Sequence, residues 1–227
     1  MNNELRSNLI NKLSDIINDE RIERLQEVLN QRTRYLTVVL DDIFLAQNSS
    51  AVIRTCECIG IQNLHIIEDR NTHKTNRDVV KGSAKWVKLN HYENRKGRID
   101  CIDNLKQQNY KIVAMTLSEG SIPLEELPLS EKLALCFGCE ETGLDKKIED
   151  NADYKVQIPI TGFTQSYNVS VSAGISLYYL YNKIKDTEQD WKLSDTEKEE
   201  LLIDWLSKST PTGQALLNKY KKEIATS

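Results

Sequence analysis

Polar residues and glycines that could form a ligand site occur in three short segments, widely separated in the 227-residue chain. The first runs from Asn48 to Arg54, the second from Phe137 to Gly143 and the third from Ile158 to Ser170. The glycines of the second segment permit positive φ angles and a close approach of a ligand to the backbone. Amide, hydroxyl, carboxylate and guanidinium groups of the three segments offer that ligand donors, acceptors and fixed charges.

Each segment taken alone also has an ordinary structural explanation. Asn48 suits a helix N-cap, Arg54 a helix surface, and Gly138–Gly143 a turn. Asn168 would likewise cap a helix that starts after it. The third segment is the most specific of the three, because a cap explains Asn168 but leaves the preceding Gln-Ser-Tyr run unexplained.

In this order, the three segments resemble the three motifs of the SPOUT (SpoU–TrmD) class of RNA methyltransferases. Gly138-Cys-Glu-Glu-Thr-Gly143 is similar to the family's Gly-x-Glu-x-x-Gly, and Gln165-Ser-Tyr-Asn-Val-Ser170 to its Gln-Ser-Leu-Asn-Val-Ser. Tyr167 replaces the usual leucine, a change expected to bear on the adenine pocket. The resemblance covers most of the chain and is strongest to the TrmH branch, which methylates a guanosine ribose in the tRNA D-loop.

The resemblance implies an enzyme that transfers a methyl group from S-adenosyl-L-methionine to the ribose 2′-OH of guanosine 18 in tRNA. It assigns catalysis to residues of all three motifs: Arg54, Asn48, Glu140, Ser166 and Asn168. Arg54 is expected to be essential, and family proposals make it the group that removes the 2′-OH proton. A free guanidinium holds its own proton above about pH 12, so Arg54 could instead orient a phosphate and stabilise the developing alkoxide.

The resemblance also implies where the cofactor binds and how the chain assembles. Backbone groups at five positions are expected to hold S-adenosyl-L-methionine: Thr116, Leu117, Gly138, Ile158 and Tyr167. A deep trefoil knot in the C-terminal third is expected to pack against its counterpart in a homodimer. Two alternatives remain: the same chemistry on rRNA, or a non-catalytic RNA-binding knot protein, which should have lost parts of the constellation.

The pattern of apolar runs and helical periodicities predicts an α/β fold. Leu36–Leu40 and Asn63–Ile67 are typical of buried strands, and they flank a helix expected over Asn48–Ile59, capped by Asn48 or Ser49 and ended by Gly60. Such a β-α-β unit favours a parallel sheet. Helices or strands are further expected at Trp86–Leu89, Ile99–Gln107, Lys111–Met115, Leu133–Phe137, Leu144–Asn151, Tyr154–Ile158, Asn168–Lys185 and Thr196–Ser207.

Together, pattern and resemblance predict a parallel-sheet SPOUT fold with a C-terminal knot, flanked by helices. One or two amphipathic helices are expected over Asn3–Asn30. The expected parts are an N-terminal helical extension at 1–34, the methyltransferase domain at 35–185 and a C-terminal helical extension at 186–227.

The distribution of charge favours tRNA as a partner, although the net charge of the chain is −4. Nine basic and two acidic residues give the segment 70–98 a net charge of +7. Phosphate contacts would use such a surplus, and the expected RNA-binding residues are Lys81, Lys85, Lys88, Arg21, Arg24, Arg32 and Arg34. Ala84 replaces a histidine common in the matching family segment, so no role is assigned to that position.

Other classes of protein find little support in the sequence. No signal peptide and no apolar run near the ~20 residues of a membrane helix is recognisable. The five cysteines, an odd number, are expected to be free thiols in the cytoplasm. The pairs Cys56/Cys58 and Cys136/Cys139 lack a second pair or histidines at zinc spacing, so no metal site is expected. Because no apolar run is long enough, no membrane partner is expected either.

Overall fold

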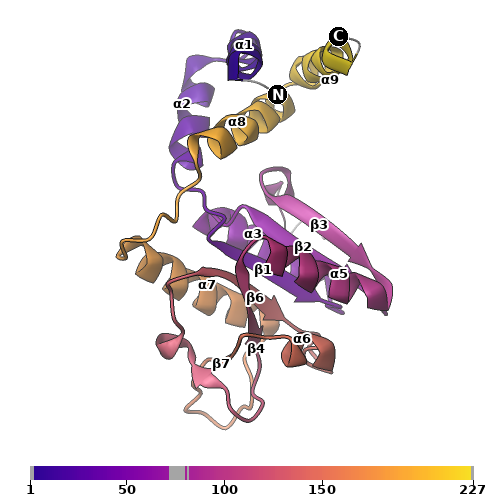
Figure 1. Ribbon diagram of the computed structural model, residues 1–227, viewed down its shortest axis with the longest axis vertical. Coiled ribbons are helices and arrows are strands. Elements are labelled where there is room, and N and C mark those ends of the chain that lie inside the picture. The colour runs from indigo at the N-terminus through magenta and orange to yellow at the C-terminus, as the bar shows by residue number, and fades with distance from the viewer. Residues whose placement is uncertain (1–2, 72–79, 81, 226–227) are drawn as a thin grey trace. The chain divides into compact units, whose positions relative to one another are not determined.

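The computed structural model describes residues 3–71, 80 and 82–225, and the chain divides into two compact units (Figure 1). The first is an α/β unit, Thr33–Trp191. The second is helical and consists of both ends of the chain, Met1–Arg32 together with Lys192–Ser227.

A seven-stranded sheet forms the centre of the α/β unit. Its strands are β1 (Leu36–Asp41), β2 (Asn63–Glu68), β3 (Lys88–Glu93), β4 (Tyr110–Met115), β5 (Ile122–Pro123), β6 (Lys132–Phe137) and β7 (Tyr154–Gln157). They lie in the order β3-β2-β1-β6-β4-β7-β5, and every pair of neighbours is parallel. The predicted parallel α/β architecture is therefore confirmed.

Helices cover both faces of this sheet, because alternate residues of each central strand point to opposite sides. Val38 and Leu40 face a core that also contains side chains of α3 (Ala46–Ile59) and α7 (Val169–Lys185). Val39 faces the other core, which includes side chains of α5 (Asn94–Gln107) and α6 (Lys146–Asp150). The residues of β1 are all buried, as the uninterrupted apolar run predicts for a strand covered on both faces.

The start of α3 differs from the prediction. Leu45 is the N-cap residue, whereas either Asn48 or Ser49 was predicted to be the cap, and Asn48 lies buried in the first turn. Asn48 is free of the capping role because its side chain bonds to residues of two other segments. The predicted end is confirmed, since Gly60 adopts a left-handed conformation with φ of 101° and stops the helix.

Some short elements lie outside the predicted ranges. The strand expected over Trp86–Leu89 begins only at Lys88, and Ser83–Lys85 forms a 3-10 turn. Strand β5 is two residues long and contains Pro123, too short for a period-2 pattern. A second 3-10 turn, Leu124–Glu126, follows it.

The helical unit contains α1 (Asn3–Ser14), α2 (Asp19–Leu29), α8 (Asp195–Ser209) and α9 (Pro211–Ala225). Helix α8 starts with a capping box, in which Ser194 and Glu197 bond reciprocally. Arg6 Nε lies 2.8 Å from Glu199 Oε2 and ties α1 to α8. Helix α9 lies in the part expected to be a C-terminal helical extension, although its own range was not predicted. No helix within the described residues is long and apolar enough to cross a membrane.

Candidate functional site

The three polar segments follow three strands of the α/β unit at the same edge of the sheet. Helix α3 begins five residues after β1 ends, the glycine loop 138–145 follows β6, and the segment 158–168 follows β7 and leads into α7. Strands β1 and β6 are direct neighbours, and β7 lies one strand beyond β6. Because all strands are parallel, their carboxyl ends meet at one edge, where open α/β sheets bind ligands.

Side chains from all three segments are joined by hydrogen bonds. Asn48 Nδ2 donates to Glu140 Oε1, and Asn168 Nδ2 donates to Asn48 Oδ1 over 3.2 Å. Glu140 Oε2 also accepts the backbone N–H of Phe44 at 3.2 Å. Asn48, Glu140 and Asn168 therefore form one continuous chain of bonds, which fixes the three segments relative to each other.

Asn168 has a second role as the N-cap of α7. Its Oδ1 accepts the backbone N–H of Ser170 at 2.9 Å and the Ser170 hydroxyl at 2.6 Å. The predicted cap is confirmed at this position. Since Oδ1 is held by the helix start, Nδ2 must point away from it, toward Asn48.

Beside this chain of bonds lies an open cavity of about 650 Å³. Its lining contains all five residues expected to hold the cofactor, Thr116, Leu117, Gly138, Ile158 and Tyr167, together with Glu140, Ser166 and Asn168. The volume falls within the range typical of small-molecule sites. Neither Asn48 nor Arg54 belongs to the cavity wall.

Within the glycine loop, the backbone approaches itself closely at Gly138. A Cβ atom on Gly138 would lie 2.2 Å from the backbone of Gly143 and Leu144, so no side chain fits there. Gly143 has a φ of 69°, and its N–H donates to Cys139 O at 2.8 Å. The two glycines thus close a tight loop against the cavity.

One wall of the cavity carries a polar cluster that the sequence analysis did not identify. Thr116 Oγ1 donates to Glu149 Oε1 at 2.7 Å, and Ser118 Oγ lies 3.1 Å from both Glu149 oxygens. Glu149 comes from α6 and the hydroxyls from the loop after β4, so no motif links them. Among the described residues of the lining, the charged side chains are Glu140 and Glu149, which makes the cavity electronegative.

Arg54 stands apart from the chain of bonds. It lies on α3, six residues after Asn48, and is exposed while Asn48 is buried. The structure places Ser166 on the cavity wall in an exposed segment.

The residues expected to bind RNA lie in different environments. Arg21 and Arg24 are exposed on α2, where Arg24 pairs with Glu27 at 3.0 Å, and Lys85 and Lys88 are exposed in the α/β unit. Arg34 is half-buried, and Lys81 lies outside the described residues.

Arg32 does not fit the expected role. Its side chain is 1% exposed and its guanidinium lies 5.1 Å from the centre of the Trp205 ring. A phosphate cannot reach a side chain buried to this extent, so the expectation that Arg32 binds RNA is corrected. The stacking of a cation on an aromatic face stabilises the helical unit instead.

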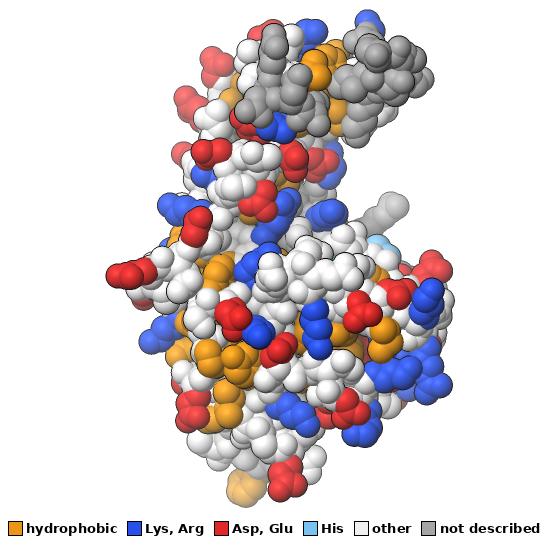
Figure 2. Space-filling model, in the orientation of Figure 1, with side chains coloured by type: hydrophobic (Ala, Val, Ile, Leu, Met, Phe, Trp, Pro, Cys, Tyr) orange, Lys and Arg blue, Asp and Glu red, His pale blue; other side chains and the backbone are white. Residues whose placement is uncertain are grey.

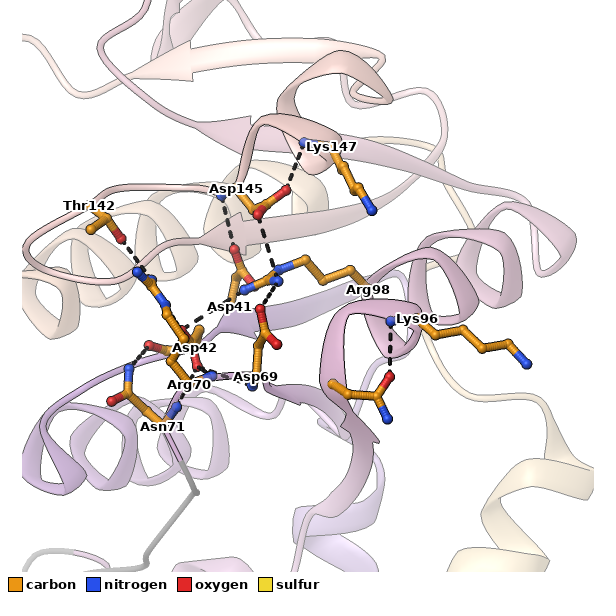
Figure 3. Close-up of polar contacts among 11 residues, drawn as sticks. Asp41, Asp42, Asp69, Arg70, Asn71, Lys96, Arg98, Thr142, Asp145 and Lys147 are labelled. Carbon is orange, nitrogen blue, oxygen red and sulfur yellow. Dashed lines mark hydrogen bonds and ion pairs between the residues drawn. The ribbon is translucent and has the colours of Figure 1, made fainter.

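A buried ion network lies behind the glycine loop (Figure 3). Arg98, whose side chain is 2% exposed, lies 2.6 Å from Asp41 and 2.6 Å from Asp69. Its Nη1 is 3.6 Å from Asp145, the N-cap of α6, and Asp41 accepts the N–H of Asp145 at 3.0 Å. Arg98 was counted in the basic segment 70–98, but its guanidinium is buried and paired with carboxylates of the fold.

Two adjacent carboxyl groups of this network differ in their pKa. Burial raises the pKa of Asp41, and this outweighs the bonds from Asp145 and Arg98 that lower it. Burial would also raise the pKa of Asp42, but the bonds it accepts from Asn71 and Arg70 lower it overall. The fold therefore stabilises the charged form of Asp42 and disfavours the charged form of Asp41.

The family of the chain follows from comparison with known proteins. Residues 35–178 match the SpoU rRNA Methylase family, and the chain belongs to that family. A relative from Borreliella burgdorferi, named tRNA (guanosine(18)-2′-O)-methyltransferase, is 46% identical over 86% of this chain and 88% of its own length.

Two solved structures share the fold. The A. aeolicus TrmH/SpoU tRNA modifying enzyme has a TM-score of 0.75 at 31% identity, over 85% of this chain and 98% of that one. The AdoMet-bound rRNA methyltransferase from Sinorhizobium meliloti has a TM-score of 0.60 at 22% identity, over 70% and 60% of the two chains.

Proposed function

We propose that this protein transfers a methyl group from S-adenosyl-L-methionine to the ribose 2′-OH of guanosine 18 in tRNA. The observation that carries the proposal is the bonded chain Asn48–Glu140–Asn168 at the edge of a cavity of about 650 Å³. The name of the 46%-identical relative supports the choice of substrate.

The cavity suits a cationic nucleoside cofactor. Glu140 and Glu149 give it negative charge, and a sulfonium carries a positive one. Gly138 and Gly143 line the cavity, and their backbone groups are proposed to contact the ligand. When bound, the cofactor supplies the electrophilic methyl group, while the protein aligns the ribose hydroxyl and helps to remove its proton.

The residues of the constellation then divide between positioning and chemistry. Glu140 and Asn48 hold the loop and α3 together, and Asn168 and Ser166 orient the ribose or Arg54. Arg54 is exposed on α3, free to approach an RNA phosphate or the developing alkoxide. Arg54→Ala should abolish turnover while cofactor affinity stays within a few-fold of the wild type, as measured by calorimetry.

A homodimer formed through α7 is part of the proposal, and so is a knot in the segment that contains β6, β7 and α7. Val171, Ile175 and Tyr178 are 47%, 38% and 67% exposed, and their spacing places them on one face of α7. Apolar side chains gather over this helix in Figure 2. Light scattering of the wild type and of Tyr178→Asp tests the dimer, and chain tracing in a crystal structure tests the knot.

Two separate groups of exposed cations are proposed to bind RNA: Lys85 and Lys88 in the α/β unit, and Arg21 and Arg24 in the helical unit. Replacing Lys85 and Lys88 together should weaken tRNA binding, and the slope of log affinity against log salt should fall by up to about two units, ~0.9 per lost phosphate contact. Cofactor affinity should not change, since neither lysine lines the cavity. An unchanged slope would move the RNA surface to Arg21 and Arg24.

The deciding experiment uses purified protein, S-adenosyl-L-methionine, EDTA and unmodified tRNA, followed by nuclease digestion and mass spectrometry. We expect 2′-O-methylguanosine at position 18. A matched tRNA with a 2′-deoxyguanosine at that position should accept no methyl group. Methylation of 23S rRNA instead of tRNA, or no methylation together with no binding of the cofactor, would contradict the proposal.

A further inference from the structure

Asp42 has a left-handed backbone conformation, with a φ of 55°, and its side chain binds the residues that follow strand β2. Its Oδ1 accepts three consecutive backbone N–H groups, from Asp69 at 3.1 Å, Arg70 at 2.9 Å and Asn71 at 2.8 Å. Its side chain is 1% exposed. A non-glycine residue in this conformation is strained, and strain of this kind persists where the surrounding contacts require it.

Arg70 connects this carboxylate to the glycine loop (Figure 3). Its Nε donates to Asp42 Oδ2 at 2.8 Å, and its Nη2 donates to Thr142 Oγ1 at 3.0 Å. Thr142 lines the cavity. A planar guanidinium can make both bonds at once, whereas a lysine ammonium is a single point of charge.

The bond to Thr142 lies between two other attachments of the same loop. On one side, Glu140 bonds to Asn48 and Phe44. On the other, the N–H of Asp145 donates to Asp41. The Arg70 side chain is 57% exposed, so its bonds contribute little to global stability but bear directly on a loop that forms the cavity.

From this geometry we propose that Arg70 is a positioning residue that holds the glycine loop in its cofactor-binding shape through Thr142. The ligand it serves is a sulfonium nucleoside, so the inference rests on the proposed function. Arg70 is oriented by Asp42 and acts on the ligand only through the loop.

The test measures the affinity of the full-length protein for S-adenosyl-L-methionine by calorimetry, without RNA. Thr142→Val removes the hydroxyl, and Arg70→Lys keeps the charge but cannot span both partners. Each should weaken binding about three- to tenfold, the worth of one hydrogen bond. Thr142→Ser keeps the hydroxyl and should bind as the wild type does, and Glu141→Gln, an exposed neighbour in the loop, is the matched control.

The double variant Arg70→Lys/Thr142→Val should bind no more weakly than the poorer single variant, because both remove the same bond. Melting temperatures should stay near that of the wild type in all variants. Wild-type cofactor affinity in both single variants would overturn the inference. A loss of tRNA affinity in Arg70→Lys alone would then make Arg70 an RNA contact, whereas a wild type that binds no cofactor would remove the proposed function itself.

Discussion

The two segments that border the cavity are built in opposite ways. The glycine loop 138–145 is tied to the end of β1 by the buried network of Arg98, Asp41 and Asp145. In the segment 158–168, by contrast, every residue is exposed or half-buried, and Phe163 is 109% exposed. The first wall, here called the anchored wall, is thus bonded to a buried ion network, although Glu140–Gly143 are themselves exposed. The second, here called the exposed wall, contains no buried residue.

Because of this difference, we expect substitutions beside the anchored wall to lower stability more than substitutions in the exposed wall do. A buried charge network is costly to assemble and to disturb, so the glycine loop should keep its shape with or without a ligand. At the end of the exposed segment, Asn168 both caps α7 and bonds to Asn48. Changes in the two walls should therefore have different consequences.

The largest loss of stability is expected from Arg98→Ala. The variant leaves the buried carboxylate of Asp41 without its guanidinium partner, a change that typically costs about 3–5 kcal/mol. Asp42 keeps its ion pair with Arg70. Denaturant unfolding measures the effect. Lys146→Ala, which removes an 85%-exposed lysine on α6, should unfold at the wild-type denaturant concentration. Equal stability of the two variants would contradict the view that the network anchors the loop.

A smaller effect is expected from Asn168→Ala in the exposed wall. Loss of an N-cap typically costs about 1 kcal/mol of stability, and loss of the amide removes the bond to Asn48. Asn168→Ser keeps a capping oxygen but lacks the amide. If the bond to Asn48 orients the site, Asn168→Ser should regain stability yet turn over about tenfold more slowly, the equivalent of one hydrogen bond. Full activity in Asn168→Ser would limit Asn168 to capping.

How well the sequence predicted each wall follows from the distance between partners along the chain. The cap at Asn168 was predictable because its acceptor bonds to Ser170, two residues away. Gly138 and Tyr167, which the resemblance assigns to the cofactor, both line the cavity. Both predictions depend on local geometry or on a motif.

Partners that are distant in the sequence could not be predicted in this way. Arg98 was interpreted as part of a basic surface because its partners Asp41 and Asp145 lie 57 and 47 residues away. Asn48 was expected to act in catalysis and also offered as a cap of α3, and the cap is wrong because its side chain bonds to Glu140, 92 residues further on. Glu149 and Ser118 meet only once β4 and α6 are packed. In each case tertiary contact decides what the side chain does.

We also expect carboxyl groups beside the anchored wall, Asp41 and Asp42, to make the free energy of unfolding depend on pH. The pKa of Asp42 is lowered in the fold, so its contribution to stability is present above the unfolded value of 3.8 and is lost as the pH falls through the folded value. Asp41 changes stability in the opposite direction. Its pKa is raised in the fold, so its contribution to stability is present at low pH and is lost as the pH rises through the folded value. The segment 158–168 contains no carboxylate side chain.

We therefore expect Asp42→Asn to be less stable than the wild type at neutral pH, and to lose less of its remaining stability on acidification. Unfolding by urea at a series of pH values from neutral to about 3 measures both effects. An acid limb as steep as that of the wild type would assign the acid sensitivity to other carboxylates and would remove this distinction between the two walls.

The smallest effect is expected from Phe163→Ala at the centre of the segment 158–168. Because the ring is fully exposed, its removal uncovers no core surface and should change stability by less than about 0.5 kcal/mol. Phe137→Ala is the matched contrast in the anchored wall: that ring is 2% exposed, and truncation of a buried phenylalanine typically costs about 3–5 kcal/mol. Denaturant unfolding of both variants compares the two rings directly. The protein concentration is kept well below the dissociation constant of the proposed dimer, so that each variant unfolds as a monomer. A clear destabilisation by Phe163→Ala under these conditions would mean that the exposed wall packs against something within the same chain, and the contrast between the two walls would fail.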